Sequence, residues 1–110
     1  YNTSMISDAD VEQAIEHMSD SASRIAKAKS ERVYLEHFLK SKRSILFAEA
    51  PGKSVGEREH WAYRHDDYLA LLQVLKDAVN EDERLRFETR SNEVLIEVWR
   101  TQQANQRGSF

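Results

Sequence analysis

The chain has 110 residues, a formal charge of −3, 32% charged residues and 40% hydrophobic residues. This length fits one small domain, and the hydrophobic content exceeds that of disordered chains. The sequence contains no cysteine, which excludes a disulfide framework and a thiolate metal site. The slightly acidic charge excludes a strongly basic nucleic-acid-binding domain, although local basic surfaces remain open.

The sequence also bears on cellular location. No run approaches the roughly 18 to 20 apolar residues of a membrane span, and the N-terminus lacks a basic region followed by an apolar one. We therefore expect a cytoplasmic protein with no membrane contact. Residues 1–4 and 108–110 do not follow the helical pattern, and we interpret them as expression-vector remnants or disordered ends around a single domain over 5–107.

The first predicted helix covers residues 8–50. Ser7 and Asp10 have the three-residue spacing of a capping box, and Pro51 cannot continue a helix. Apolar residues between these signals follow a spacing of three and four: Val11, Ala14, Ile15, Met18, Ala22, Ile25, Ala28, Leu35, Leu39 and Leu46.

A linker over residues 51–54 and a short helix over 55–64 follow. Two of the three glycines and the only proline fall between Pro51 and Gly56, which marks the main break in the chain. Ser54 and Glu57 form a second capping-box match, in which each side chain can bond the other residue's backbone amide.

The last predicted helix covers residues 66–106, with Asp66 or Asp67 as its N-cap. Its apolar stripe comprises Tyr68, Leu69, Leu71, Leu72, Leu75, Ala78, Val79, Leu85, Leu95, Ile96 and Trp99. Two long helices joined by a short irregular segment favour an all-α fold, an antiparallel helical hairpin with a short connecting helix and coiled-coil-like packing.

The apolar residues of both long helices cover more than one face, so one partner helix cannot bury them all. Each fully buried Val, Leu, Ile or Phe contributes about 1.5 to 3 kcal/mol. We therefore expect homo-oligomerisation, as a dimer or a higher assembly, into a helical bundle. The predicted interface residues are Leu35, Phe38, Leu39, Leu46, Leu71, Leu72, Leu75 and Val79.

One stretch of the first helix is basic. Helical spacing places Lys29, Arg32, Lys40 and Arg43 on one face, where they could meet successive phosphates of a nucleic acid. A solvated or partner-facing surface is the alternative, because charged faces are usual on long amphipathic helices. In an antiparallel arrangement the acidic residues between Asp77 and Glu83 would neutralise part of this face.

Signals for catalysis are weak. Glu57 and His60 form a Glu-x-x-His pair, but a di-metal bundle needs a second such pair and two further carboxylates. The four histidines are scattered, with no nucleophile at a recognisable spacing. We therefore predict no catalytic residues, no metal and no cofactor.

Two stretches carry a family resemblance: residues 57–63, which read EREHWAY, and residues 96–101, which read IEVWRT, with Ala104, Asn105 and Arg107 beyond. They resemble a family of small helical proteins of bacteriophages and prophages, with looser similarity over 30–36 and 68–86. The family has no assigned activity, and its genes tend to lie among phage DNA replication and recombination genes. The resemblance implies a phage accessory protein in a bacterial host and supplies no catalytic residues.

Three functional hypotheses follow. The first is a non-enzymatic accessory protein or adaptor in DNA replication or recombination, with weak nucleic-acid contact through the basic face and with a phage or host DNA-metabolism protein as partner. The second is a protein-interaction or inhibitory module that binds a host or phage protein without touching DNA. The third, ranked last, is a metal-dependent enzyme.

Overall fold

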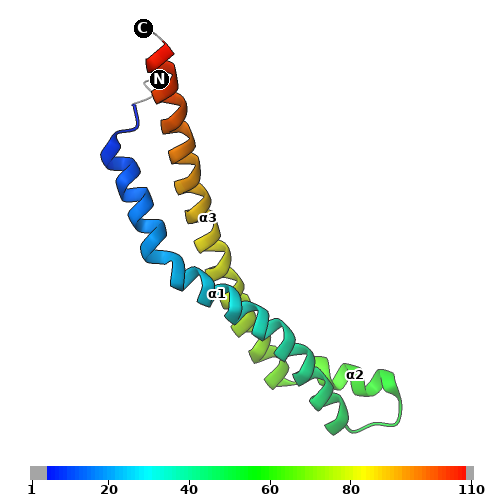
Figure 1. Cartoon of the computed structure of the whole chain (residues 1–110). Helices are drawn as coiled ribbons and strands as arrows, with labels where there is room; N and C mark the ends of the chain where they lie inside the picture. Colours follow the sequence, from blue (N-terminus) through cyan, green and yellow to red (C-terminus); the bar gives the residue numbers. More distant parts are fainter. Residues whose placement is uncertain (1–4, 109–110) are drawn as a thin grey trace. The chain divides into compact units, whose positions relative to one another are not determined.

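The computed structural model describes residues 5–108 and contains three helices: α1 (Asp8–Glu49), α2 (Val55–Arg64) and α3 (Asp66–Gly108) (Figure 1). No strand occurs among these residues. The all-α prediction, with two long helices and a short one between them, is confirmed. The predicted ends differ by one residue for α1 and by two for α3, which includes Gly108. The expectation about the chain ends otherwise falls on residues 1–4 and 109–110, outside the described part.

The start of α1 is fixed by the predicted reciprocal cap. The Asp10 amide donates to Ser7 Oγ at 3.1 Å, and the Ser7 amide donates to Asp10 Oδ2 at 3.0 Å. The Ser7 amide and hydroxyl together hold the pKa of the Asp10 carboxyl below its usual range, because both bonds favour the charged form. Two backbone donors that a helix start leaves free are thereby satisfied.

The turn before α2 depends on a glycine. Gly52 has φ of +123°, and a Cβ at this position would lie 2.9 Å from Glu57 Oε2. Ser54 Oγ accepts the Glu57 amide at 3.1 Å as predicted. The Glu57 carboxylate, however, accepts the backbone amide of Lys53 at 3.2 Å and not that of Ser54. The turn at Gly52 directs the Lys53 amide toward this carboxylate.

Arg58 links α2 to the last turn of α1 by hydrogen bonds. Its guanidinium donates to the Phe47 carbonyl at 3.1 Å and to the Ala48 carbonyl at 3.2 Å. The same group lies 4.7 Å from the centre of the Phe47 ring. A helix leaves its last carbonyls without intrahelical donors, so Arg58 both satisfies these groups and holds α2 against α1.

The cap of α3 differs from the prediction. The Asp67 amide donates to Nδ1 of His65 at 3.0 Å, and the Leu69 amide donates to the His65 carbonyl at 3.1 Å. His65 therefore acts as the N-cap, and the prediction of an aspartate cap was wrong. Asp66 and Asp67 instead occupy the first turn, where carboxylates interact favourably with the helix dipole.

The described chain divides into two compact units, one containing residues up to Ala26 together with those from Glu83 onward, and the other spanning Lys27–Asp82. We call them the terminal unit and the central unit. Both long helices contribute to both units, so the division does not separate the chain into two consecutive halves.

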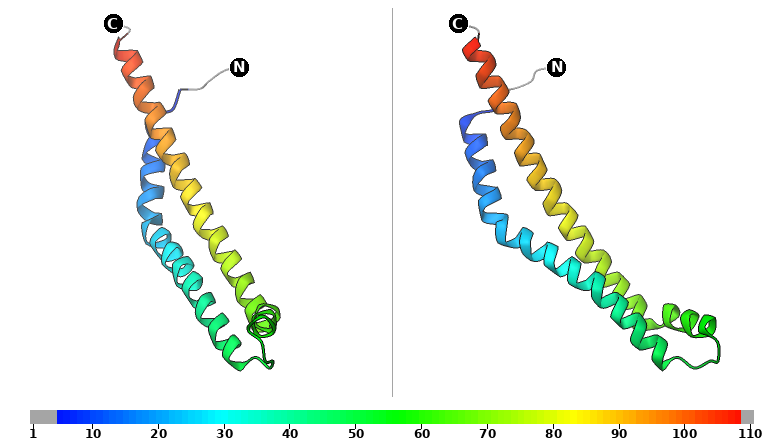
Figure 2. Two further views of the ribbon diagram at one scale, coloured as in Figure 1. Left: turned by 90° about the vertical axis from the view of Figure 1, so that its right-hand side faces the viewer. Right: turned by 45° about the vertical axis from the view of Figure 1, so that its right-hand side comes forward.

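In the terminal unit, α1 and α3 run antiparallel (Figure 2). Trp99 Nε1 donates to Asp8 Oδ1 at 3.2 Å, and His17 lies 3.2 Å from Asn92, closer to the middle of α3. Val11, Ala14 and Leu85 are its buried apolar residues. This core is small, since only one large side chain in it is fully enclosed.

In the central unit, α1 and α3 also run antiparallel, with α2 beside them. Arg32 contacts Asp82 near one end of the paired segments, and Lys42 contacts Asp67 near the other. The buried apolar residues are Ala28, Leu35, Leu46, Ala50 and Ala62. Three of these five are alanines, so the internal core contributes little apolar area.

Candidate interaction surface

The four predicted nucleic-acid-binding residues do not form one free surface. Arg32 Nη1 lies 2.9 Å from Asp82 Oδ2, and Arg32 Nε lies 3.0 Å from Glu36 Oε1. Asp82 is only 2% exposed, so this pair joins α1 to α3 in the interior of the central unit. The guanidinium of Arg32 is thereby engaged within the chain, which sequence spacing alone does not reveal.

Lys29, Lys40 and Arg43 differ from Arg32. All three are exposed, and neither lysine forms an ion pair with another residue between 5 and 108. Arg43 Nη1 donates to the Tyr63 hydroxyl at 2.7 Å, a neutral partner that leaves the charge of the guanidinium uncompensated. Two of the four predicted cations, Lys40 and Arg43, are brought together with aromatic residues.

Lys40 and Arg43 lie in a depression of about 300 Å³. Its lining residues are Leu39, Lys40, Arg43, Tyr63 and Tyr68. The ring of Tyr63 meets that of Tyr68 edge to face with 5.4 Å between centroids, and the Arg43 guanidinium lies 5.6 Å from the Tyr63 ring centre. Tyr63 remains 42% exposed. We call this set the tyrosine–cation depression.

Sequence reasoning missed the two tyrosines as site residues. Tyr63 is the last aromatic residue of α2 and Tyr68 lies in the first turn of α3, so the break at His65 places both beside the same part of α1. A possible signal was the pair of tyrosines flanking a predicted helix break. The spacing of the cations on α1 gave no indication of what would face them.

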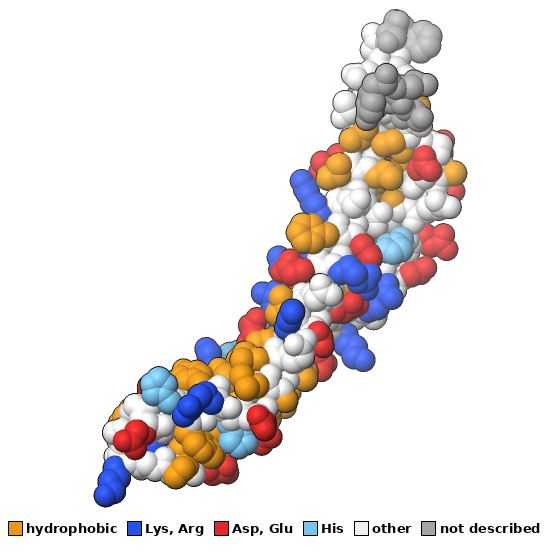
Figure 3. Space-filling model, turned by 180° about the vertical axis from the view of Figure 1, so that it is seen from behind, with side chains coloured by type: hydrophobic (Ala, Val, Ile, Leu, Met, Phe, Trp, Pro, Cys, Tyr) orange, Lys and Arg blue, Asp and Glu red, His pale blue; other side chains and the backbone are white. Residues whose placement is uncertain are grey.

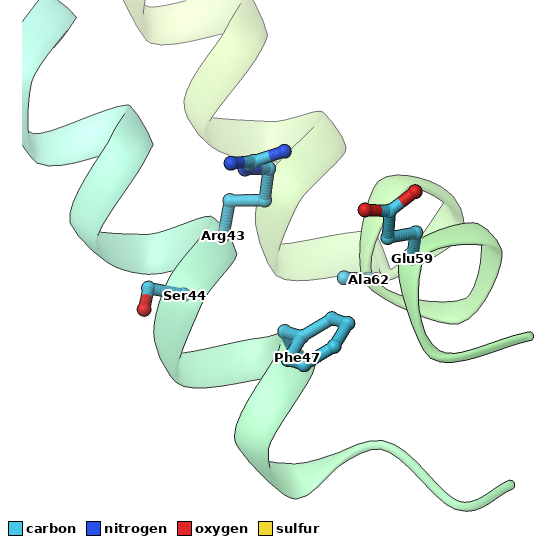
Figure 4. Close-up of a pocket in the computed structure, with 5 residues that line it drawn as sticks. All are labelled: Arg43, Ser44, Phe47, Glu59 and Ala62. Atoms are coloured by element: carbon cyan, nitrogen blue, oxygen red, sulfur yellow. The ribbon is translucent and has the colours of Figure 1, made fainter. Parts of the chain in front are cut away.

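A second depression, of about 200 Å³, lies beside the first and is lined by Arg43, Ser44, Phe47, Glu59 and Ala62. In Figure 4 the Arg43 and Phe47 side chains extend from α1 toward α2, which carries Glu59 and Ala62. Glu59 makes this depression mixed in charge. Arg43 thus lines both depressions. One of them also contains a carboxylate, and the other contains two tyrosines and a lysine.

Exposed apolar residues are the other marked feature of the central unit, and Figure 3 shows hydrophobic side chains gathered over the end of the molecule that carries α2. The Tyr34 and Phe38 rings stack with centroids 5.9 Å apart, and Tyr34 is 62% exposed. The large exposed apolar residues of this unit are Val33, Tyr34, Phe38, Ile45, Val55, Tyr63, Leu69, Leu72 and Val74.

The predicted oligomer-interface residues divide into three groups. Leu35 and Leu46 are buried by contacts within the chain, and Leu46, at 1% exposure, has almost no surface to offer a second copy. Leu39, Leu71, Leu75 and Val79 are half-buried. Phe38 and Leu72 are exposed. The sequence stripe therefore mixes residues of the internal core with residues that lie on the surface.

The structure gives no sign of a metal centre among residues 5–108, where no three of the His, Asp and Glu side chains lie close enough to hold an ion. The Glu57 carboxylate of the Glu-x-x-His pair already accepts the Lys53 amide. No helix in the described range is long and apolar enough to cross a membrane.

Comparisons with protein-family models, with curated proteins and with solved structures find no match to this chain. The resemblance of residues 57–63 and 96–101 to phage proteins therefore stays a prediction.

Proposed function

We propose that the chain is a non-enzymatic helical module that assembles with a second copy of itself and acts as an accessory or adaptor protein. The observation that carries this proposal is the exposure of nine large apolar residues in the central unit after α1, α2 and α3 have packed together. Burial of apolar surface contributes about 25 cal/mol per Å², so leaving this surface in water forgoes a large stabilisation.

The interface that we propose is a stripe on α1 made of Tyr34, Phe38 and Ile45, with Ser41 between the last two. Their spacing of three and four residues places them on one side of the helix, and all four are exposed. We call this set the α1 stripe. Two aromatic residues are followed along it by a small residue and an aliphatic one. In an antiparallel pair of identical helices, the large side chains of one copy can pack over the small Ser41 of the other around a two-fold axis.

A charge-introducing variant tests this proposal. The double variant Tyr34→Glu and Phe38→Glu places carboxylates where two copies would meet, and glutamate is a good helix former at exposed positions. We expect the parent chain to elute as a dimer or larger species in size-exclusion chromatography with light scattering, and the double variant to elute as a single copy with unchanged helicity.

The double variant Phe87→Glu and Val94→Glu, and the single variant Phe87→Glu, are the controls. Phe87 lies on α3 in the terminal unit and is 71% exposed, so the substitution has the same chemistry outside the α1 stripe. Both controls should keep the assembly of the parent. A parent chain that is a single copy at all concentrations, or equal dissociation by either control, contradicts the proposed interface.

The adaptor role is proposed to operate in DNA replication or recombination, in the cytoplasm of a bacterial host, and this part rests on the family resemblance alone. A protein-interaction module without DNA contact is the second candidate, and the pairing of Arg32 with Asp82 favours it. That pairing removes one of the four cations on which the nucleic-acid hypothesis depended. Nuclease-treated pull-downs are made with the parent and with the double variant Tyr34→Glu and Phe38→Glu, which we call the α1-stripe variant. A partner that requires the assembly binds the parent alone, and a partner that does not require it binds both.

A further inference from the structure

We infer that the tyrosine–cation depression is a binding site for single-stranded nucleic acid, in which Lys40 and Arg43 contact phosphates and the exposed part of Tyr63 stacks on a base. This inference rests on the proposed role in DNA replication or recombination and assigns it a nucleic-acid contact. The pairing of Arg32 with Asp82 removes one cation from that contact and leaves Lys40 and Arg43. The inference does not depend on self-association, because the site lies within one copy of the chain.

The charges of Lys40 and Arg43 are not neutralised within the described part of the chain. Many of the arginines in α1 and α3 face a carboxylate: Arg32 faces Glu36 and Asp82, Arg84 faces Glu88, Arg86 faces Glu83 and Arg90 faces Glu93. Lys40 forms no ion pair within the described range, and the bond from Arg43 goes to a phenol hydroxyl. Two adjacent positive charges are left to the solvent in a chain of net charge −3.

The carboxylates near this depression pair with other cations or line the second depression. Glu36, one turn before Lys40, bonds to Arg32 at 3.0 Å. Asp67, one residue before Tyr68, lies 3.6 Å from Lys42. Glu59 borders the second depression and does not line the first. The tyrosine–cation depression therefore keeps a positive character.

Lys40 and Arg43 are spaced to contact neighbouring phosphates. Residues three apart on a helix have Cβ atoms about 5 to 6 Å apart, so Lys40 and Arg43 can each reach one of two successive phosphates. The hydroxyl of Tyr63 holds the Arg43 guanidinium at 2.7 Å, which fixes the cation before any ligand arrives. A group already fixed in position loses less conformational entropy on binding.

The depression combines cations with an exposed aromatic ring. Proteins that bind single strands pair cations along the backbone with aromatic rings on which bases stack. Tyr63 is 42% exposed, and Tyr68 supports its ring from the side at 5.4 Å between centroids. A duplex hides the faces of its bases, so this site should favour a single strand. An acidic peptide would use the cations but gain little from the tyrosine.

The test is fluorescence anisotropy with a labelled oligothymidylate short enough to occupy one site. Each phosphate contact to a single strand contributes about −0.7 to the slope of log K against log salt, so two contacts predict about −1.4. Lys40→Gln should reduce this slope to about −0.7. Tyr63→Ala should weaken binding by roughly ten- to a hundred-fold through loss of stacking. Tyr63→Phe keeps the ring but removes the hydroxyl that holds Arg43, so it should weaken binding by less than Tyr63→Ala does.

Two controls define specificity. Lys27→Gln removes the same charge from an exposed position on α1 outside the depression and should leave the affinity unchanged. The neutral stripe variant Tyr34→Ser and Phe38→Ser also removes the apolar interface but adds no carboxylate near Lys40. It should lose self-association and bind the oligonucleotide with parental affinity per chain, so failure of self-association and failure of this site can be told apart. Circular dichroism establishes that each variant keeps its helicity.

Four results would overturn the inference. They are no binding at the lowest salt tested, equal weakening by Lys27→Gln and Lys40→Gln, tighter binding of duplex than of single strand, and displacement of the strand by oligoglutamate as effectively as by unlabelled oligothymidylate. The last result would assign the depression to an acidic peptide.

Discussion

Substitution of Arg32 should destabilise the protein more than substitution of its buried partner Asp82. The Asp82 side chain is 3% exposed, and Arg32 is its only ion-pair partner among the described residues. Arg32→Met therefore leaves a buried carboxylate without a counter-charge. Removing one partner of a buried pair costs about 3 to 5 kcal/mol, and we expect a value near 3 because the Arg32 side chain is 27% exposed.

Asp82→Asn should cost less. Arg32 keeps its bond to Glu36 at 3.0 Å after this change, and part of its guanidinium reaches water. The loss is then that of one charged hydrogen bond, about 1.5 to 3 kcal/mol. The double variant Arg32→Met and Asp82→Leu removes both charges, and we expect it to be more stable than Arg32→Met alone.

Chemical denaturation of these chains at one protein concentration gives their free energies of unfolding. The single variant Asp82→Leu, measured in the same way, closes the cycle with Arg32→Met and the double variant and gives the coupling energy between the two residues. A fixed concentration matters because self-association contributes to apparent stability. If Arg32→Met remains within about 0.5 kcal/mol of the parent, Asp82 is not a buried charge in solution and the reasoning fails.

Three further predictions concern packing, the turn and the first cap. Leu46→Ala should lower the free energy of unfolding by about 2 to 5 kcal/mol in denaturant titrations, whereas the exposed Phe87→Ala should stay within about 0.5 kcal/mol of the parent; similar losses from both would contradict the assigned core. Gly52→Ala should lower the free energy of unfolding by more than about 1 kcal/mol and lower Tm, because φ is +123° and the new Cβ would meet Glu57 Oε2. Gly56→Ala is the control and should not lower Tm, because the space around Gly56 is open. Because the folded-state pKa of Asp10 is lowered, its carboxylate stabilises the protein above the unfolded pKa, and this contribution is lost as the pH falls through the folded value. Asp10→Asn should therefore be less stable than the parent near neutral pH and equal to it in strong acid; a difference that persists in thermal melts at low pH would refute the cap.

Local signals were sufficient for the helices. The pairs Ser7 with Asp10 and Ser54 with Glu57 were readable because each cap involves residues three apart, and Pro51 marks a break whatever the tertiary context. The cap of α3 was missed because an imidazole nitrogen can replace a carboxylate oxygen as acceptor at His65, and composition favours the aspartates that follow.

The surfaces were less predictable, because they depend on contacts between distant residues. Arg32 and Asp82 lie 50 positions apart, so the spacing that grouped Arg32 with Lys40 could not show that its charge was engaged. Leu35 and Leu46 share a helical stripe with Leu39, yet only the packing of α1 with the rest of the central unit decides which leucines are fully enclosed. The hydrogen bond between Arg43 and Tyr63 depends on the packing of α2 against α1, which the spacing of residues on α1 does not show.

The most direct test of the assembly is the distance between two copies across the α1 stripe. The sequence contains no cysteine, so Ser41→Cys introduces a single site for a spin label in the middle of the stripe. We expect strong dipolar coupling between labels on two copies, and its loss on dilution with unlabelled protein. Absence of coupling in the Ser41→Cys chain, or equally strong coupling from a label at Phe87→Cys, would contradict assembly through this stripe.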